Sequence, residues 1–342
     1  MKRDGQTTGS TECRYDLLTL GRCSMDLFSQ QIGAAFVEVE SFSTQVGGSP
    51  TNIAIGTSRL GLRSAAVTAV GADLVGEFVR RYLREQGVAT DFVLTKKGRT
   101  CLAVVSIQPP DTFPLVFYRD DPPDQYINIG DMKPLPLADT PLLLVAGSNF
   151  AAGDLRNASL YAARKAKEHG ATVTIDLDLR PTLWPHPNGY SINMQIVWNS
   201  CDIVIGTEEE VWAALSDAPE LVWNGKSLPA EQMPTLMALI HTHQQAGQTI
   251  VLKRGPRGVT LFLDNSQTID VAGFPVEVLN TVGAGDAFAS GLLFARRQGW
   301  TWQRAARFAN ACGAIVVTRH GCSAAMPTKQ EVDQFVAERG GL

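Results

Sequence analysis

One short stretch near the carboxyl end of the chain combines small residues with a single acid. In NTVGAGDAFASG, Gly283, Ala284 and Gly285 directly precede Asp286 and an apolar helical pattern. Small residues before a helix let backbone N–H groups converge, and the helix start adds a partial positive charge. We therefore expect an anion hole at Gly283, Ala284 and Gly285, with phosphate as its natural guest.

Asp286 has two interpretations, which the motif alone leaves about equally open. The helix dipole favours an acid at any such position, so in the first interpretation Asp286 is only the acid of a helix start. Phosphoryl transfer from ATP to a hydroxyl, however, needs a carboxylate that accepts the proton of the alcohol, beside donors that hold the migrating charge. In the second interpretation Asp286 is that general base.

A second glycine motif, GGSPTNIAIGTSRLG, lies near the amino end. It opens with Gly47 and Gly48, followed by Ser49 as a helix N-cap and Pro50 at the first helical position. Asn52 then falls in the first turn, where its amide can donate to and accept from sugar hydroxyls. The alternative is an asparagine that satisfies local backbone groups, which is common near helix starts.

Together the two motifs resemble the two signatures of the ribokinase-like (PfkB) carbohydrate kinases, and the resemblance runs from about Tyr15 to Pro327. It implies an ATP-dependent sugar kinase with a three-layer α/β/α core, a mostly parallel central sheet and a small β-sheet lid. It also implies Mg²⁺ carried with ATP and a homodimer formed through the lid. The matching positions imply Asp286 as catalytic base, Gly283, Ala284 and Gly285 as anion hole, and Asp26, Gly47, Gly48 and Asn52 as sugar-binding residues.

Two further segments resemble family members that act on keto-deoxy sugar acids. DLDLRPTLW (176–184) is similar to their DxNxR segment and FYRDD (117–121) to their YYR segment. The resemblance implies that Tyr118 and Arg119 reach a substrate carboxylate from the lid. Arg180 would bind either phosphate or the acid, since a guanidinium forms bidentate pairs with both. Asp178 stands where the family has Asn.

The wider set of motifs is most similar to members that phosphorylate 5-dehydro-2-deoxy-D-gluconate to its 6-phosphate in myo-inositol catabolism. A kinase of 2-keto-3-deoxygluconate or fructose is the alternative, and a requirement for a substrate carboxylate separates the first two from fructose. An alternative of another class is a catalytically silent sugar-binding regulator, because the DxNxR and NxxE segments are altered. Retention of Asp286 argues against it.

Cofactor and nucleotide residues follow from the same resemblance. The family's NxxE frame reads here from Gly206 to Glu209, so Glu209 is the expected metal residue, unless TEEE is simply an acid-rich first helical turn. Asn280 stands where family members frequently have Asp, at a position that the resemblance links to a possible monovalent cation (K⁺). The expected ATP-binding residues are Lys253, Gly255, Gly258 and Asn310. The alternatives are that Lys253 is a solvated lysine and that Asn310 is an amide that packs a helix.

The elements that must position these residues follow from periodicity. Short apolar runs beginning near residues 15, 64, 141, 171, 202 and 249 alternate with helical patterns, which predicts a mostly parallel sheet covered on both faces. Asp26 follows the first strand, or caps the next turn. Segments 34–48 and 98–120 break the rhythm and predict a lid, or ordinary edge hairpins. The predicted organisation is a flexible tail (1–14), one kinase domain (15–333) and a C-terminal tail (334–342).

Composition excludes several other classes. The 342 residues carry 30 Lys plus Arg against 34 Asp plus Glu, a balance that argues against a nucleic-acid or anionic membrane partner. The six cysteines form no CxxC pair and follow no apolar leader, which predicts a cytoplasmic protein with reduced thiols. The histidines lack metal-ligand spacing, and no GxGxxG follows the first strand, which disfavours structural zinc and a dehydrogenase.

Overall fold

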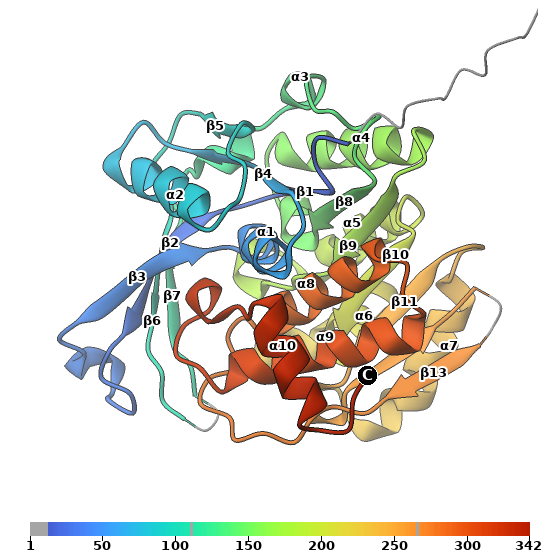
Figure 1. The fold of residues 1–342 in the computed structure, drawn as a ribbon. Coiled ribbons are helices and arrows are strands. Elements are labelled where there is room, and N and C mark those ends of the chain that lie inside the picture. The colour runs from blue at the N-terminus through green and yellow to red at the C-terminus, as the bar shows by residue number, and fades with distance from the viewer. Residues whose placement is uncertain (1–12, 110–111, 265–266) are drawn as a thin grey trace, which may run out of the picture.

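The computed structural model describes residues 13–109, 112–264 and 267–342, and a nine-stranded sheet forms its centre (Figure 1). The strand order is β13-β12-β11-β10-β9-β8-β1-β4-β5. All neighbours from β11 to β5 are parallel, and β12 and β13 join antiparallel at one edge, so the predicted sheet is confirmed. The strands are β1 (Leu17–Leu20), β4 (Ser64–Val70), β5 (Val93–Thr95), β8 (Leu142–Ala146), β9 (Thr172–Asp176), β10 (Ile203–Thr207), β11 (Thr249–Lys253), β12 (Val259–Phe262) and β13 (Thr268–Val271).

Helices cover both faces of this sheet because its strands are apolar on both sides. In β8, Leu142 and Leu144 belong to one buried apolar cluster, and Leu143 and Val145 belong to a second. Side chains alternate across a strand, so the two clusters lie on opposite faces, and the predicted three-layer α/β/α architecture is confirmed. The first cluster includes residues of α1 (Ser49–Leu60), α2 (Leu74–Glu85), α8 (Ala284–Arg297), α9 (Trp302–Val317) and α10 (Lys329–Ala337). The second includes residues of α3 (Ile129–Met132), α4 (Leu155–Glu168), α5 (Pro187–Trp198), α6 (Glu208–Leu215) and α7 (Met233–His243).

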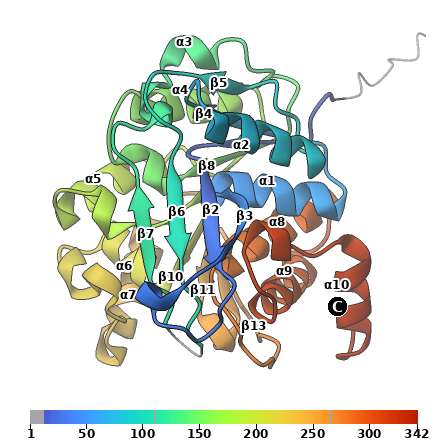
Figure 2. The same cartoon turned by 90° about the vertical axis from the view of Figure 1, so that its left-hand side faces the viewer.

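A separate four-stranded sheet of order β3-β2-β6-β7 forms the lid, which lies beside the core at the left of Figure 1 and faces the viewer in Figure 2. Its strands are β2 (Ser24–Ser29), β3 (Phe42–Gly47), β6 (Leu102–Val105) and β7 (Leu115–Tyr118). The small sheet predicted from 34–48 and 98–120 is confirmed, but the sequence reading missed β2. That strand begins four residues after β1 ends and pairs with both β3 and β6. Asp26 therefore lies on a lid strand rather than in a turn after β1.

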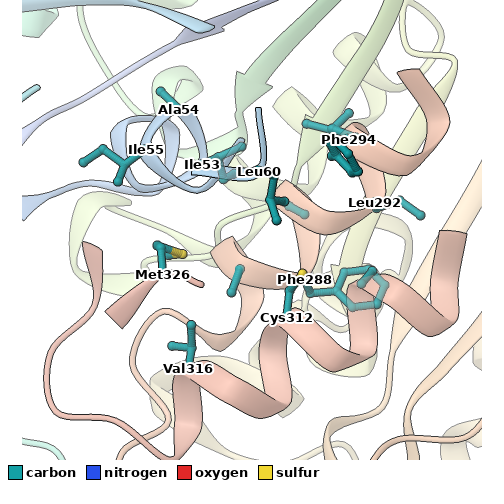
Figure 3. Packing of buried hydrophobic residues seen from close by; sticks show 14 of the residues in the cluster. Ile53, Ala54, Ile55, Leu60, Phe288, Leu292, Phe294, Cys312, Val316 and Met326 are labelled. Atoms are coloured by element: carbon teal, nitrogen blue, oxygen red, sulfur yellow. The ribbon is translucent and has the colours of Figure 1, made fainter. Parts of the chain in front are cut away.

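Helix α8 packs closely against both α1 and α9 (Figure 3). Figure 3 shows Phe288 of α8 and Cys312 of α9 in one apolar cluster. Two glycines permit the approach. A Cβ atom on Gly56 of α1 would lie 2.3 Å from Ser290 Oγ, and one on Gly291 of α8 would lie 2.7 Å from Cys312 Sγ. These contacts fix where α8 starts, and this is where the NTVGAGDAFASG motif lies.

The ends of the chain differ in part from the prediction. The tail predicted for 1–14 lies almost wholly outside the described residues. At the other end α10 continues through Ala337 and buries Val336, so the helix crosses the boundary predicted at 333. All six cysteines are free thiols. None of the helices in the described ranges has the length and apolar character needed to cross a bilayer.

Replacing Gly291 by alanine should destabilise the protein, because the added methyl group meets Cys312 Sγ at 2.7 Å. Overpacking of this kind lowers the free energy of unfolding by about 1–3 kcal/mol. Gly189 in α5 is the matched control, since its added Cβ would meet only Trp184 at an ordinary 3.7 Å. Gly189→Ala should be neutral or stabilising by up to about 1 kcal/mol through helix propensity. Urea unfolding of both variants tests this, and equal effects would contradict it.

Candidate active site

The two glycine motifs meet in space although 234 residues separate them in sequence. Asn52 in the first turn of α1 donates from Nδ2 to Asp286 Oδ2 in the first turn of α8, at 2.8 Å. The Nδ2 atom also lies 3.1 Å from Cys322 Sγ. Asn52 Oδ1 is enclosed and has no hydrogen-bond partner among the described residues. The amide therefore keeps one free acceptor next to the candidate base.

The start of α8 has the properties of an anion hole. Gly283 adopts a φ of +88° before the helix, and no side chain caps the helix start. The backbone N–H groups of Gly285 and Asp286 find no acceptor in the described part of the chain. A Cβ atom on Gly283 would lie 2.5 Å from Cys322 Sγ, so only glycine fits there. Free helix-start amides are suited to bind phosphate.

Lys253 adds a buried positive charge to this anion hole. Its Nζ lies 3.6 Å from Asp176 Oδ1 and 3.6 Å from Glu210 Oε2, and only 14% of its side chain is exposed. A Cβ atom on Gly285 would lie 3.1 Å from the same Nζ. Burial alone would lower the pKa of Lys253, but Asp176 and Glu210 raise it above its ordinary value. The lysine stays charged beside the free amides, and the alternative of a solvated lysine is wrong.

The structure places Glu210, rather than Glu209, in this cluster. Glu210 contacts Lys253 and also accepts hydrogen bonds from the backbone N–H groups of Thr207 and Leu179. Glu209 Oε1 instead lies 3.4 Å from the Leu228 amide nitrogen. Successive helical residues point about 100° apart, so one acid of TEEE faces the site and its neighbour does not. The sequence analysis placed the NxxE segment one residue too early, and it therefore selected Glu209 instead of Glu210.

A magnesium ion fits this site only as a partner of bound phosphate. Within the described residues, no group of three or more His, Cys, Asp or Glu side chains could hold a metal ion. Asp176 and Glu210 nevertheless both approach Lys253 next to the anion hole. Mg²⁺ commonly uses one or two carboxylates together with substrate phosphates. The two acids therefore suit an ion that arrives with the nucleotide.

Asp26 reaches the site from lid strand β2. Its Oδ1 accepts a hydrogen bond from Ser24 Oγ at 2.6 Å. Burial raises the pKa of Asp26 to about 6, against the opposing effects of Ser24 and Arg22. A Cβ atom on Gly47 would lie 1.8 Å from Asp26 Oδ2, and one on Gly48 would lie 2.5 Å from the Arg22 carbonyl oxygen. The two glycines thus make room for the chain that carries Asp26.

The lid residues predicted to reach a substrate carboxylate lie differently. Tyr118 is 61% exposed, and strand alternation places it on the face opposite Phe117, which lies over Arg22 with a ring-to-guanidinium distance of 5.8 Å. Arg119 faces inward, but its guanidinium forms a bidentate pair with the buried carboxylate of Asp124. Neither side chain is placed as the sequence reading expected.

Arg180 belongs to a buried charge cluster that includes one residue the sequence reading missed. Arg180 Nη2 lies 2.9 Å from Asp178 Oδ1, and Arg22 Nη2 lies 3.1 Å from Asp178 Oδ2. Arg22 comes from GRCSMD, directly after the glycine that ends β1. That position at the carboxyl end of a parallel strand was the available signal, because ligands bind there in open α/β sheets.

The residues predicted to bind ATP differ in their surroundings: one lies in open space, and two pack against backbone. Gly255 lies in open space at a φ of +56°. Gly258 is required by packing, since its Cβ would lie 2.1 Å from the Val271 carbonyl oxygen. Asn310 Nδ2 donates to the carbonyl oxygens of Val271 and Ala272, which is the contact of a packing amide. Gly258 and Asn310 therefore both hold the backbone that leaves β13.

Asn280 does not provide the chemistry of a monovalent cation site. It is fully buried, its Nδ2 donates to the Gly321 carbonyl oxygen, and its Oδ1 accepts from the Val282 amide, both at 2.8 Å. The neutral amide carries no negative charge and uses both its ends for hydrogen bonds inside the protein. The expectation of K⁺ therefore finds no support at this residue.

A carboxylate beside free helix-start amides, at the carboxyl edge of a parallel sheet with a lid, defines a small-molecule kinase. The chain belongs to the pfkB family of carbohydrate kinases, whose model matches residues 15–329. Over 330 residues it is 30% identical to a 5-dehydro-2-deoxygluconokinase from Listeria monocytogenes serotype 4b, covering 96% of this chain and 98% of that one.

Solved structures show the same fold. A putative ribokinase II from E. coli, in complex with ATP and Mg²⁺, matches with a TM-score of 0.80 at 22% identity and covers 95% of this chain and 99% of its own. A double-mutant fructokinase from Vibrio cholerae O395, bound to fructose, ADP and potassium, matches with a TM-score of 0.78 at 24% identity and the same coverage. The family model and the kinase that is 30% identical over nearly the full length together make this chain an ATP-dependent carbohydrate kinase.

Asp26→Asn should stabilise the unliganded protein at alkaline pH. The folded pKa of about 6 is raised above the ordinary value of 3.8, so the stability cost of ionising Asp26 grows between about pH 4 and pH 6, is complete above pH 6 and disappears below pH 4. Each pKa unit corresponds to about 1.4 kcal/mol, so the gain at pH 8 is up to about 3 kcal/mol. Urea unfolding at pH 8 and pH 4.5 measures the difference. An equal gain at both values would contradict the assignment.

Proposed function

We propose that this kinase phosphorylates a hydroxyl of a keto-deoxy sugar acid, and that 5-dehydro-2-deoxy-D-gluconate is its substrate, giving the 6-phosphate. The name of the curated relative supports this sugar. The observation that carries the chemistry is the Asp286 carboxylate, held by Asn52 beside amides that have no other acceptor. We also propose a homodimer through the lid, whose β3 and β7 strands expose the apolar side chains of Phe42, Leu115, Val116 and Tyr118.

In the proposed reaction Asp286 accepts the proton of the sugar hydroxyl. The hydroxyl oxygen attacks the γ-phosphorus, the bond from that phosphorus to the bridging oxygen of ADP breaks, and ADP leaves. Burial raises the pKa of Asp286, and the hydrogen bond from Asn52 opposes the rise. A carboxylate with a raised pKa is a better proton acceptor near neutral pH.

The remaining groups bind the two substrates and stabilise the negative charge of the phosphoryl group. The N–H groups of Gly285 and Asp286, with Lys253, neutralise the transferring phosphoryl group. Asp26 accepts hydrogen bonds from sugar hydroxyls, and Asn52 Oδ1 offers a further acceptor. Asp176 and Glu210 would hold a Mg²⁺ ion that arrives with the nucleotide, and the ion would supply positive charge to the phosphates. ATP lies along Lys253 and Gly255, beside the backbone after β13 that Gly258 and Asn310 hold in place.

Asp286→Asn should lower kcat by ~10² to 10⁴-fold, because it keeps the shape but removes the base. ATP binding, measured by calorimetry, should persist. The assay is ADP release with 5-dehydro-2-deoxygluconate, 2-keto-3-deoxygluconate and fructose in parallel. Glu331→Gln is the matched control, since Glu331 is also an acid in a first helical turn but lies in α10.

Three outcomes would change this proposal. Near-full activity of Asp286→Asn would reduce Asp286 to a helix-start acid. Preference for another sugar would keep the kinase and replace the substrate. Sugar binding without turnover of any sugar would favour the silent regulator, which the retained base and free amides argue against.

Glu210→Gln should raise the Mg²⁺ concentration needed for half-maximal activity, because it removes one of two carboxylates beside Lys253. Loss of such an orienting acid typically costs about 10- to 100-fold in metal affinity or activity. The adjacent Glu209→Gln removes the same charge at Leu228 and should leave the Mg²⁺ dependence unchanged. A larger effect from Glu209→Gln would restore the sequence-based frame.

A further inference from the structure

Three arginines lie where core and lid meet, and their charges are balanced differently. Arg119 forms an ion pair with Asp124 through two hydrogen bonds between the side chains, and no other arginine shares that carboxylate among the described residues. Arg22 and Arg180 instead share the single carboxylate of Asp178. Arg119 and Asp124 therefore form a neutral pair, whereas Arg22 and Arg180 divide one neighbouring carboxylate between them. The Arg180 side chain is 39% exposed, so an incoming anion can reach it.

Arg22 also has unused hydrogen-bonding capacity. It is 6% exposed, its Nε donates to Ser148 Oγ, and its Nη2 donates to Asp178. Nη1 has no hydrogen-bond acceptor among the described residues. Nη1 is not one of the fully enclosed side-chain atoms that lack a partner, so it remains accessible to an incoming hydrogen-bond acceptor. The Phe117 ring of the lid, 5.8 Å away, covers the same guanidinium.

Asp178 has the geometry of a residue that orients its neighbours. Its carboxylate accepts from Ser148 Oγ at 2.7 Å in addition to the two arginines. Its backbone has a φ of +37°, a conformation that costs a non-glycine residue about 1–3 kcal/mol. Burial alone would raise its pKa, but Arg180 and Arg22 hold the pKa of Asp178 below its ordinary value. It therefore remains an anion that fixes both guanidinium groups.

We propose that Arg22, together with Arg180, forms the subsite that binds the carboxylate of the substrate, and that Asp178 is the positioning residue for both. This rests on the proposed sugar-acid kinase and names the residues that select its substrate class. A guanidinium pairs with a carboxylate through two parallel hydrogen bonds, which suits the unfilled fork of Arg22.

The order of charges along the site gives the substrate its direction. The Asp26 carboxylate lies against Gly47, the next residue Gly48 lies against the Arg22 backbone, and Asn52 in the following helical turn bonds Asp286. Consistent with this placement, Arg22 lowers the pKa of Asp26 and Asp286 raises it. The carboxylate end of the sugar then lies at Arg22, its hydroxyls at Asp26, and the reacting hydroxyl at Asp286. The selected substrates are acids in which the phosphorylated hydroxyl is remote from the carboxylate.

The test compares 5-dehydro-2-deoxygluconate with its carboxamide, which has the same shape and no charge. Arg22→Gln should lower kcat/KM for the acid by about 10- to 100-fold, the value of a charge-assisted hydrogen-bonded pair, and leave the carboxamide nearly unchanged. Arg22→Lys should recover part of the preference through its charge. Arg22→Gln/Asp178→Asn removes both charges and provides a folded background if the single variant leaves Asp178 unstable. Its preference for the acid should also be lost.

Arg119→Gln is the matched control, because it also removes a buried arginine from an aspartate pair. It should lose stability and keep the preference for the acid. Equal slowing of acid and carboxamide by Arg22→Gln would make Arg22 merely structural, and selective loss of preference in Arg119→Gln would move the subsite to the lid. Both results leave the sugar-acid kinase intact. A wild-type enzyme that shows no preference for the acid would overturn the proposed substrate class itself.

Discussion

The hydrogen bond between Asn52 and Asp286 is the contact on which the site depends. It joins the first turns of two helices that lie 234 residues apart in sequence. The bond requires α1 and α8 to pack so closely that Gly56 and Ser290 nearly touch, and it requires α8 to begin at Gly283. The core therefore sets the position of the base, and a shift of either helix would separate the base from its partner and from the free amides.

The burial of charged side chains at the site is the second constraint, and it lowers the stability of the folded protein. Asp26 has a pKa raised by burial, whereas Lys253 and Asp178 keep their charges through partners. A site that held only paired charges would have nothing left to bind a ligand. The uncovered amides of α8, the free Oδ1 of Asn52 and the shared carboxylate of Asp178 are the places where pairing is incomplete. Each of these lies at the carboxyl edge of the sheet, between core and lid.

The sequence allowed the regular parts to be predicted, because apolar runs and glycine motifs are local signals. The parallel sheet covered on both faces followed from periodicity, whereas the lid, which periodicity left open against edge hairpins, followed from the family resemblance. Two of the errors at the site have the same cause, because the sequence did not show in which direction a side chain points. Whether Glu209 or Glu210 faces the site depends on where α6 begins, and whether Phe117 or Tyr118 faces inward depends on strand phase. The place of Arg22 just after β1 was a local signal, but its pairing with Asp178 could not be predicted because 156 residues separate the two.

The lid is fixed to the site at its base. Gln45 of β3 accepts hydrogen bonds at Oε1 from the backbone N–H groups of Cys322 and Ala324, at 2.9 and 3.0 Å. The Cys322 side chain in turn packs against Gly283, at the anion hole. A movement at the base of β3 would therefore pull on the residues that shape the phosphate site. Lid motion that preserves the site must bend the strands beyond Gln45, toward Phe42, where the burial of β3 falls away.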